Sequence, residues 1–588
     1  MGGSGCGSAR VGNRKGHGSG RGPGGKWLAG EPAHPGRERF PEKGSTRIAG
    51  GSLIVRERGR AGLKAAGSHF PRDPLPASAE VVIVGAGVIG CAIARELTRY
   101  TPDVVVLEKE NDVACGASKA NNAEVHSGIG EEAGTLKQKL NVRGNYLYEQ
   151  FIEGLGVDFK RQGLLIVVTP RSLPPEAVET MSEEEREELL RVKIPQGIVA
   201  YGEKAGIRGL RILDRDEVLR REPNVTPEAT SGVFDPNYGL VCPYKLTIAL
   251  GEHAILNGAR IFLNTEVTGI RVEDGKVRGV ITDRGEIATG LVINAAGVFA
   301  DEVAEMAGAG GFKIHPRKGA TLLFDREVTS EYVRSSVSLF KLPSMRKERS
   351  KGGGAMPTAE GNLQLGPTAV EVEDKYDTSI SAEEIEEIFN RFHYLLPGFP
   401  RDAVISAFSG VRAPTYEEDF VIEASDKVQG FVNVAGIQSP GLASAPAIVE
   451  MVMGILRDMG VSLREREDFN PVRPTVPRFA ELDDRERDRL IKKDPRWGHI
   501  VCRCEYVTEA EVVAAIHSLI PATDMDAVKR RTRTGMGRCQ GGFCGHRVAA
   551  ILARELGVPV TAITKNGPDS PFYLGEAKEF LRSPGEEG

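Results

Sequence analysis

The sequence has few cysteines, no long apolar run and no excess of positive charge. Eight cysteines among 588 residues are too few for a disulfide scaffold. No segment approaches the roughly 18 continuous apolar residues of a membrane-spanning helix, and the first residues lack the apolar core of a secretory signal. With 76 Lys and Arg against 81 Asp and Glu, the net charge is −5. These absences give no general reason to expect membrane insertion, secretion or nucleic-acid binding, and we expect a cytoplasmic protein.

The first 78 residues differ in composition from the rest. Residues 1–78 hold 14 Lys and Arg against 5 Asp and Glu, and 19 of the 71 glycines. Such a segment cannot bury enough apolar surface to offset its chain entropy, so we interpret 1–78 as a disordered basic segment. A basic arm that binds nucleic acid, or translation from an upstream start codon chosen in error, would look the same.

The next segment predicts a strand, a helix and a second strand. An apolar run at 80–84 is followed by Gly85-Ala-Gly87-Val-Ile-Gly90, a helix over 88–100 and a buried strand at 104–107. In this context Gly85 permits a tight turn, Gly87 lets the backbone approach a pyrophosphate, and Gly90 lets helix and strand pack closely. Glu108, 18 residues after Gly90, can accept hydrogen bonds from a ribose. We therefore predict a site for FAD or NAD.

Other elements can be predicted along the chain. The helices expected are 176–192, 381–395 with Ser381 as N-cap, and 443–459; the strands are 259–264, 290–294, 403–408 and 431–435. Residues 269–289 alternate as in a hairpin, with Asp274-Gly275 as the turn. Residues 462–496 are charged and contain proline, which favours a linker, 497–556 form a Cys-bearing module, and 557–588 form a tail.

Several loops, in order, resemble the FAD-dependent oxidoreductases of the D-amino-acid-oxidase type. The loops are Gly116 to Asn121, Asn294 to Asp301 and Ala435 to Leu442, and the resemblance covers 79–455. It implies an α/β fold, with a discontinuous Rossmann-type FAD domain and an interleaved α+β substrate domain that holds an antiparallel sheet. It also implies the following FAD contacts: Gly85, Gly87, Gly90, Glu108, Lys109, Ser118, Lys119, Asn121, Val267, Ala296, Gly297, Gly410, Gly436, Ile437, Gln438, Ser439, Gly441 and Leu442.

Four of the eight cysteines lie together near the end. Cys502-Arg-Cys504 is followed by 34 residues and then by Cys539-Gln-Gly-Gly-Phe-Cys544. Four thiolates can hold zinc or a 2Fe–2S cluster, and a Cys-x-Cys pair is less typical of zinc. The module resembles the bacterioferritin-associated-ferredoxin type of small 2Fe–2S domain. The stretch Arg533 to Cys544 is similar to the version fused to large subunits of anaerobic glycerol-3-phosphate dehydrogenases.

Two residues are candidates for the substrate site. Ser409-Gly-Val-Arg412 ends a predicted strand and is similar to the family's Gly-Val-Arg signature, which implies that Arg412 binds a substrate anion over the flavin. His126 lies where related enzymes often carry a histidine near the flavin, so we propose it as base or flavin contact. A structural ion pair for Arg412 and a buried structural histidine for His126 remain the alternatives.

Together these features predict an FAD enzyme with a 2Fe–2S C-terminal domain. It would oxidise a small anionic hydroxy compound and pass electrons to a partner subunit or carrier. Among the candidate substrates, sn-glycerol 3-phosphate is the leading one. Peripheral membrane association would come through that partner, and no nucleic acid is expected. The resemblance implies a Lys where this chain has Gln438, and that loop looks more like L-2-hydroxyglutarate-type oxidoreductases. A 2-hydroxy or amino acid oxidoreductase, and a non-catalytic electron-transfer subunit, are the alternatives.

Overall fold

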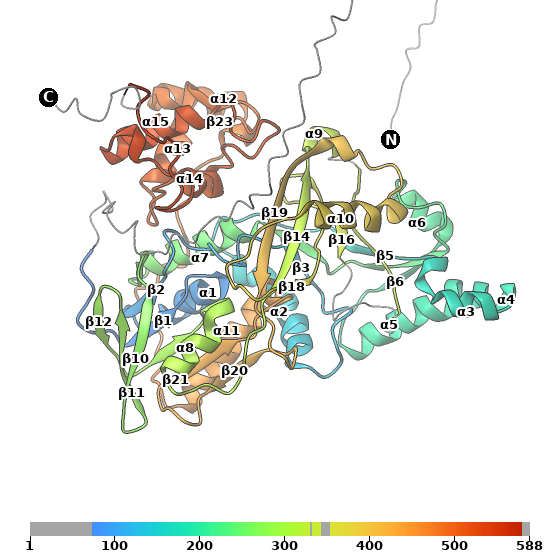
Figure 1. Ribbon diagram of the computed structural model, residues 1–588, viewed down its shortest axis with the longest axis horizontal. Helices are drawn as coiled ribbons and strands as arrows, with labels where there is room; N and C mark the ends of the chain where they lie inside the picture. Colours follow the sequence, from blue (N-terminus) through green and yellow to red (C-terminus); the bar gives the residue numbers. More distant parts are fainter. Residues whose placement is uncertain (1–72, 330–331, 343–352, 579–588) are drawn as a thin grey trace, which may run out of the picture. The chain divides into compact units, whose positions relative to one another are not determined.

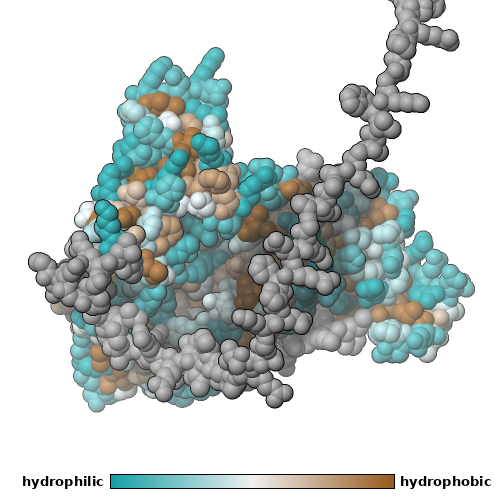
Figure 2. Space-filling view, turned by 45° about the horizontal axis from the view of Figure 1, so that its top comes forward, coloured by the Kyte–Doolittle hydropathy of each residue, from teal (hydrophilic) through white to brown (hydrophobic). Residues whose placement is uncertain are grey.

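The computed structural model describes residues 73–329, 332–342 and 353–578 (Figure 1). The predicted disordered segment 1–78 therefore lies almost wholly outside the described residues. The described part combines a parallel sheet, a large mixed sheet and a helical C-terminal module, and it confirms the predicted fold class. Among these residues, no helix is both long and apolar enough to cross a membrane. Hydrophilic side chains cover most of the coloured surface in Figure 2, with apolar residues in small patches between them.

The first sheet has six strands in the order β20-β21-β13-β1-β2-β9. All its pairings are parallel except that of β20 with β21. Its central strands β1 and β2 are continuous apolar runs because both faces are covered, one by helices α1, α7 and α11 and the other by α8 and a small antiparallel sheet. The bounds are β1 Val81–Val84, β2 Val104–Leu107, β9 Arg260–Phe262, β13 Val292–Asn294, β20 Val421–Ala424 and β21 Phe431–Ala435, and the helices are α1 Val88–Leu97, α2 Leu136–Ile152, α7 Pro243–Leu256, α8 Ala300–Met306 and α11 Gly441–Asp458.

This sheet is assembled from segments far apart in the sequence. Strand β1 pairs with β2 on one side and with β13, more than 180 residues further on, on the other. The predicted discontinuous arrangement of strand, helix and strand is therefore what the structure shows. Buried side chains of α1, α7 and α11 form one core with strands β1 and β2.

The second sheet has nine strands, eight of them in the order β18-β14-β17-β16-β15-β5-β7-β6, while β19 pairs with β14. The pairing of β14 with β19 is antiparallel and brings Gly319 opposite Gly410. Its strands are β5 Leu164–Val168, β6 Arg211–Asp214, β7 Ser231–Asp235, β14 Arg317–Phe324, β15 Ser336–Leu339, β16 Gly354–Pro357, β17 Leu363–Gly366, β18 Val370–Glu371 and β19 Val404–Arg412.

Two small sheets complete the first 460 residues. The predicted hairpin is confirmed: β10 Val267–Glu273 and β11 Lys276–Thr282 meet at Asp274 and Gly275, whose φ angles of 49° and 70° suit a two-residue turn, and β12 Gly285–Ala288 follows. The other sheet joins β3 Glu124–Val125, β8 Gly239–Val241 and β4 Phe159–Arg161. It places Glu124 and its neighbour His126 beside the second sheet.

One predicted helix is wrong. Residues 176–192 are not continuous, because Ser182 ends one helix and caps the next in a capping box with Glu185. The segment holds α3 Pro175–Thr180, α4 Glu183–Glu188, a π-turn at Leu189–Lys193 and α5 Ile194–Lys204. By contrast, α10 Ala382–Leu395 begins at the predicted cap, where Ser381 and Glu384 exchange hydrogen bonds.

The C-terminal module is mainly helical. It contains β22 Ile500–Cys502, β23 Val507–Thr508, α13 Glu509–Ile516, α14 Met525–Thr532 and α15 Gly545–Leu556, which share a core. The segment predicted as a linker is partly ordered structure, since α12 Asp484–Lys493 begins at an Asp483–Glu486 capping box and Phe479 is buried. The remaining short helices are α6 Arg215–Arg221 and α9 Arg326–Thr329.

Candidate functional site

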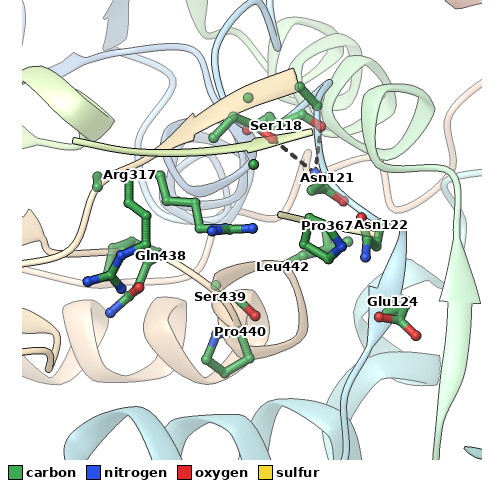
Figure 3. Close-up of a pocket in the computed structure, with 18 of the residues that line it drawn as sticks. Ser118, Asn121, Asn122, Glu124, Arg317, Pro367, Gln438, Ser439, Pro440 and Leu442 are labelled. Carbon is green, nitrogen blue, oxygen red and sulfur yellow. Dashed lines mark hydrogen bonds between the residues drawn. The ribbon is translucent and has the colours of Figure 1, made fainter. Parts of the chain in front are cut away.

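A cavity of about 900 Å³ lies between the two large sheets. Its floor is formed where β1, β13 and β21 end and α1 and α11 begin, and its other wall by β5, β14, β15 and β19. The carboxyl ends of parallel strands are where such folds bind their ligands. Figure 3 shows side chains from both sides directed into this space, among them Ser118, Glu124 and Arg317.

At one end of the cavity lies the N-terminus of α1. Gly87 is the N-cap and supplies no side-chain acceptor, and no acidic residue lies in the first turn. Ser118 Oγ accepts the N–H of Val88 at 2.9 Å. A Cβ on Gly90 would lie 1.9 Å from the carbonyl oxygen of Gly85, so only glycine permits this turn. A helix start with no acidic residue in its first turn and with closely approaching backbone fits a pyrophosphate.

Glu108 lies beside this turn at the end of β2. Its carboxylate accepts hydrogen bonds from the N–H groups of Ala86, at 2.8 Å, and Glu110, at 3.0 Å. Burial raises the pKa of Glu108, and the two N–H groups oppose that rise. The carboxylate is thereby fixed with acceptor positions directed at the cavity, as a ribose requires.

The opposite end of the cavity is formed by the loop before α11. Residues Ile437 to Leu442 line the cavity, and Pro440, the N-cap of α11, supplies no side-chain acceptor. Gln438, labelled in Figure 3, is oriented by a 2.7 Å hydrogen bond from its Nε2 to Glu418. The free N–H groups and positive dipole end would stabilise negative charge on the pyrimidine edge of a flavin. Both ends of the cavity therefore fit FAD.

Most of the predicted cofactor residues line this single cavity. Asn121 does so from a loop that it braces by donating to the carbonyl oxygens of Ala117 and Ser118. Gly90 packs the helix against the turn, Gly436 adopts a φ of 70° just before the lining loop, and Val267 is buried in the core. Those that line the cavity are Gly85, Gly87, Glu108, Lys109, Ser118, Lys119, Asn121, Ala296, Gly297, Gly410, Ile437, Gln438, Ser439, Gly441 and Leu442, whereas Gly90, Val267 and Gly436 do not.

Arg412 and Arg317 lie on paired strands, but carboxylates balance the charge of Arg317 alone of the two. Arg317 donates to Glu371 at 2.5 Å and to Glu418 at 2.6 Å. Arg412 donates one hydrogen bond, from Nη2 to the carbonyl oxygen of Thr368 at 2.9 Å, and has no carboxylate within ion-pair distance among the described residues. Burial and the Arg317 charge lower the pKa of Arg412 to about 10, so it stays protonated at neutral pH.

His126 faces the cavity within a hydrogen-bonded group. Its Nδ1 lies 2.7 Å from Tyr238 Oη, and its Nε2 lies 3.9 Å from Glu124 Oε2. Tyr238 is buried, and burial together with the Glu124 charge raises the pKa of its phenol well above the usual value. The phenol therefore stays protonated, and its contact with Nδ1 fixes the orientation of the imidazole ring.

The structure adds cavity residues for which the sequence gave no motif. Tyr238 comes from the turn before β8, and Asn566 comes from the predicted tail, beyond the Cys module. Lys109 packs with its ammonium 3.4 Å from the centre of the Phe299 ring and donates to Tyr376 Oη at 2.8 Å. These residues meet only through the tertiary fold.

The four clustered cysteines lie in the C-terminal module as two pairs. Cys504 Sγ is 3.7 Å from Cys539 Sγ, and the thiols of Cys502 and Cys544 are close enough to shift each other's pKa. The Cys544 contact and the N–H groups of Gly535 and Glu505 lower the pKa of Cys502 to about 6. In the described part of the chain, no three His, Cys, Asp or Glu side chains converge on a point suited to one metal ion. Thiols paired in this way fit two irons better than one zinc ion.

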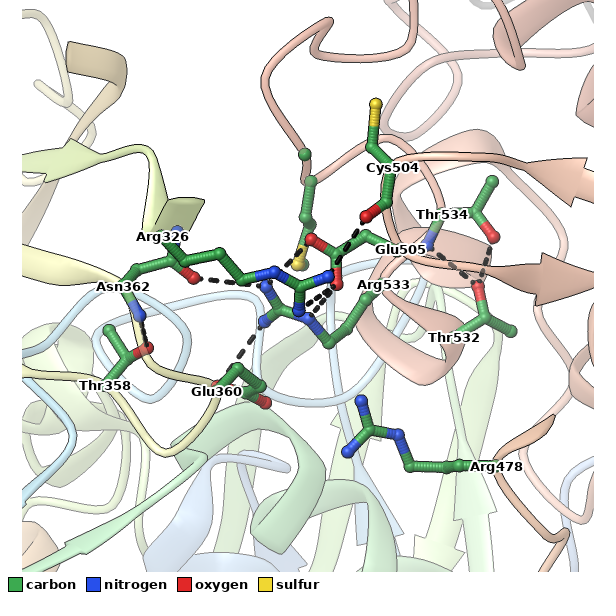
Figure 4. Close-up of polar contacts among 12 residues, drawn as sticks. Arg326, Thr358, Glu360, Asn362, Arg478, Cys504, Glu505, Thr532, Arg533 and Thr534 are labelled. Carbon is green, nitrogen blue, oxygen red and sulfur yellow. Dashed lines mark hydrogen bonds and ion pairs between the residues drawn. The ribbon is translucent and has the colours of Figure 1, made fainter. Parts of the chain in front are cut away.

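The module is held to the rest of the chain by buried ion pairs. Arg533 donates to Glu505 at 2.8 Å and lies 3.4 Å from Glu360, while Arg326 Nη2 donates to the carbonyl oxygen of Cys504 at 3.0 Å (Figure 4). A second set joins Arg530 and Arg531 to Asp112, at 2.7 and 2.8 Å. Cys504, a candidate cluster ligand, is therefore held by Arg326 of α9, the short helix that follows β14.

Comparison with known protein families gives two matches. Residues 80–453 match the family described as FAD dependent oxidoreductase, and 500–554 match the BFD-like [2Fe-2S] binding domain. The chain belongs to the FAD-dependent oxidoreductase family. Its cofactors are FAD, for which the cavity is suited, and a 2Fe–2S cluster, for which Cys502, Cys504, Cys539 and Cys544 are the candidate ligands.

The chain is similar to several named proteins of the FAD-dependent family. A protein of Caloramator mitchellensis named glycerol 3-phosphate dehydrogenase is 40% identical over 505 residues, which covers 86% of this chain and all of that one. Anaerobic glycerol-3-phosphate dehydrogenase subunit A1 of Haloferax volcanii is 27% identical over 81% of this chain and 83% of its own. The FAD-bound structure of L-alpha-glycerophosphate oxidase from Mycoplasma pneumoniae is similar, with a TM-score of 0.60, 28% identity, and coverage of 68% of this chain and 100% of that one.

Proposed function

We propose that the chain is a glycerol-3-phosphate dehydrogenase that passes electrons through its C-terminal module to a separate acceptor. The structural observation that carries this proposal is Arg412, a half-buried arginine that lines the cavity and has no carboxylate partner among the described residues. Such a charge is costly unless an anion balances it when substrate binds. The 40% identity to a protein named glycerol 3-phosphate dehydrogenase supplies the class of anion.

Arg412 is the residue that would bind the phosphate. Gly319, on the neighbouring strand β14, makes room for it, because a Cβ at Gly319 would lie 2.3 Å from Arg412 Nη2. The guanidinium keeps four N–H groups beyond the one given to Thr368, and its fork suits two phosphate oxygens. Arg317 would contribute little to the binding of the anion, because Glu371 and Glu418 already balance its charge.

His126 is the residue that would take the hydroxyl proton. The hydrogen bond to Tyr238 directs the Nε2 lone pair away from that partner, and Glu124, 3.9 Å from Nε2, would stabilise the imidazolium that forms. Bound FAD would accept the hydride equivalent from carbon, and the 2Fe–2S cluster would carry electrons singly. The protein's own part is thus to bind the phosphate, orient the C–OH group and hold the proton.

The acceptor is proposed to be a partner subunit or carrier. The C-terminal module matches a 2Fe–2S family, and the Haloferax relative is named as one subunit of an enzyme. A one-electron centre next to a flavin suits transfer to such a partner. We propose that any association with a membrane is made by that partner.

Anaerobic reduction of the flavin tests the proposed substrate. Mixing the FAD-loaded chain with sn-glycerol 3-phosphate should bleach the flavin absorbance, and L-2-hydroxyglutarate or an amino acid should not. Bleaching by a 2-hydroxy or amino acid alone would instead support the alternative that Gln438 raises. Bleaching by none of them, but by a reduced partner protein, would support a non-catalytic electron-transfer subunit.

The role of Arg412 can be tested by substitution. Arg412→Gln should raise KM for glycerol 3-phosphate about 10- to 100-fold, because a charge-assisted pair contributes about 1.5–3 kcal/mol. FAD content should be unchanged. In the wild type, affinity should fall as pH rises through about 10, where Arg412 loses its proton. An unchanged KM in Arg412→Gln would exclude it as the phosphate ligand.

A further inference from the structure

A second cavity, of about 470 Å³, lies at the β6 edge of the nine-stranded sheet. It forms where β5, β6 and β15 begin and β7 ends, since the register places Arg211 opposite Phe234 and Ser336 opposite Leu164. The last turn of α6 covers it. The cavity is lined by Gln162, Arg211, Leu213, Glu217, Arg220, Arg221, Glu222, Arg334 and Ser335.

The lining has an excess of positive charge. It contains four arginines and two glutamates, and both carboxylates are already engaged. Glu217 accepts the N–H of Asp214 in a capping box, and Glu222 accepts from the backbone of Arg334 and from the backbone and hydroxyl of Ser335. Among the described residues, no carboxylate lies within ion-pair distance of Arg211, Arg220 or Arg221. The excess charge is therefore not balanced by the protein.

Arg221 is fixed in place but lacks a hydrogen-bond partner. Its guanidinium carbon lies 3.4 Å from the centre of the Phe234 ring, and that of Arg211 lies 5.3 Å from the same ring. The Nε of Arg221 is buried, and no described residue accepts from it. The stacking fixes the plane of the Arg221 guanidinium and so orients its Nη groups at the cavity that Arg221 lines.

We propose that this second cavity binds a phosphate-class dianion, either inorganic phosphate or a small phosphomonoester. Guanidinium groups form paired hydrogen bonds with phosphate oxygens, and several unbalanced arginines suit two negative charges better than one. The lining has a single aliphatic side chain, Leu213, so it offers little to an apolar ligand. The site is separate from the proposed Arg412 site in the flavin cavity.

The two cavities are linked by a short chain of hydrogen bonds. Gln162, in the second cavity, donates from Nε2 to Ser336 Oγ at 3.0 Å, and Ser336 Oγ donates to Glu124 Oε1 at 3.2 Å. Glu124 and Ser336 line the flavin cavity. Any test must therefore read the two sites separately.

Calorimetric titration of the FAD-loaded full chain with inorganic phosphate tests the second site. Total binding is measured by heat, and binding at the flavin by perturbation of the flavin spectrum. The wild type should bind phosphate at a site that leaves the flavin spectrum unchanged. Arg211→Gln/Arg221→Gln should weaken that site about tenfold or more, from the loss of charge-assisted hydrogen bonds, and should leave the flavin-perturbing site intact.

Matched variants and ligands complete the test. Arg211→Gln alone should lose part of the phosphate affinity of the second cavity. Because Arg211 is exposed, this single variant should fold normally and so controls for misfolding of the double variant. Arg215→Gln, exposed on α6 outside the lining, should bind as the wild type does. Titration with glycerol 2-phosphate shows whether a phosphomonoester binds more tightly than free phosphate. Unchanged binding in the double variant, or equal binding of acetate, would overturn the proposal.

Discussion

The flavin cavity and the cysteine module are built in opposite ways. The cavity draws on loops from Gly85 to Leu442 and even on Asn566, whereas the four cysteines lie within 43 residues, from Cys502 to Cys544. The cavity therefore depends on the packing of both large sheets, and the cysteine site on one small core. This difference implies that either cofactor can be lost while the other is retained.

The largest effect is expected from Cys539→Ser. Removal of one of four thiolate ligands should abolish the 2Fe–2S absorbance, while FAD content and flavin reduction by glycerol 3-phosphate remain. Cys115→Ser, outside the module, is the control and should keep the cluster. Iron and sulfide analysis with visible spectroscopy measures both. Loss of FAD together with the cluster would show that the two regions are not independent.

The reciprocal test is Gly90→Ala. Its Cβ would lie 1.9 Å from the Gly85 carbonyl oxygen, so the turn that approaches the pyrophosphate must move. We expect most of the bound FAD to be lost, with a destabilisation of about 1–3 kcal/mol from overpacking, and the cluster to be retained. Gly454→Ala, in α11 with no atom within 4 Å of the added Cβ, is the matched control. Flavin content after purification is the measurement, and full occupancy in Gly90→Ala would contradict this account.

An effect on stability, rather than on cofactor content, is expected at the contact between the regions. Asp112 is buried between Arg530 and Arg531, so Asp112→Asn should destabilise the module by about 3 kcal/mol because two guanidiniums lose their counter-charge. Burial acts to raise the pKa of Asp112, but Arg531 and Arg530 lower it to about 2. Because the folded-state pKa lies below the unfolded one, this stabilisation is present above about pH 4 and is lost as pH falls towards 2.

Thermal unfolding followed through the cluster absorbance measures the effect of Asp112→Asn. Asp73→Asn, at an exposed position, is the control. Equal melting temperatures for wild type and Asp112→Asn would mean that the ion pairs do not hold the module in place.

The same contrast, between sites built from one short stretch of chain and sites built from distant segments, decides what could be predicted from the sequence. The glycine turn and Glu108 could be predicted because their geometry depends on residues close together in the sequence. The four cysteines could be predicted for the same reason, since they lie in one short segment. The contact of His126 with Tyr238, and the role of Asp112, could not, because they depend on segments about 100 or more residues apart.

Two local errors have a different cause. The predicted helix 176–192 and linker 462–496 each contain a capping box, at Ser182–Glu185 and at Asp483–Glu486, which marks the start of a helix. That signal was present in the sequence. Arg412 differs again: its motif suggested the role, but only the structure shows that no described carboxylate balances its charge.

The central claim is that glycerol 3-phosphate reduces a flavin that then supplies the cysteine-bound cluster. Its most direct test is anaerobic addition of sn-glycerol 3-phosphate to the full chain, with flavin absorbance and the electron paramagnetic resonance of the cluster followed together. We predict bleaching of the flavin followed by the signal of a reduced 2Fe–2S cluster, and in Cys539→Ser the bleaching alone. A flavin that stays oxidised, or a cluster that is reduced while the flavin is absent, would contradict the account.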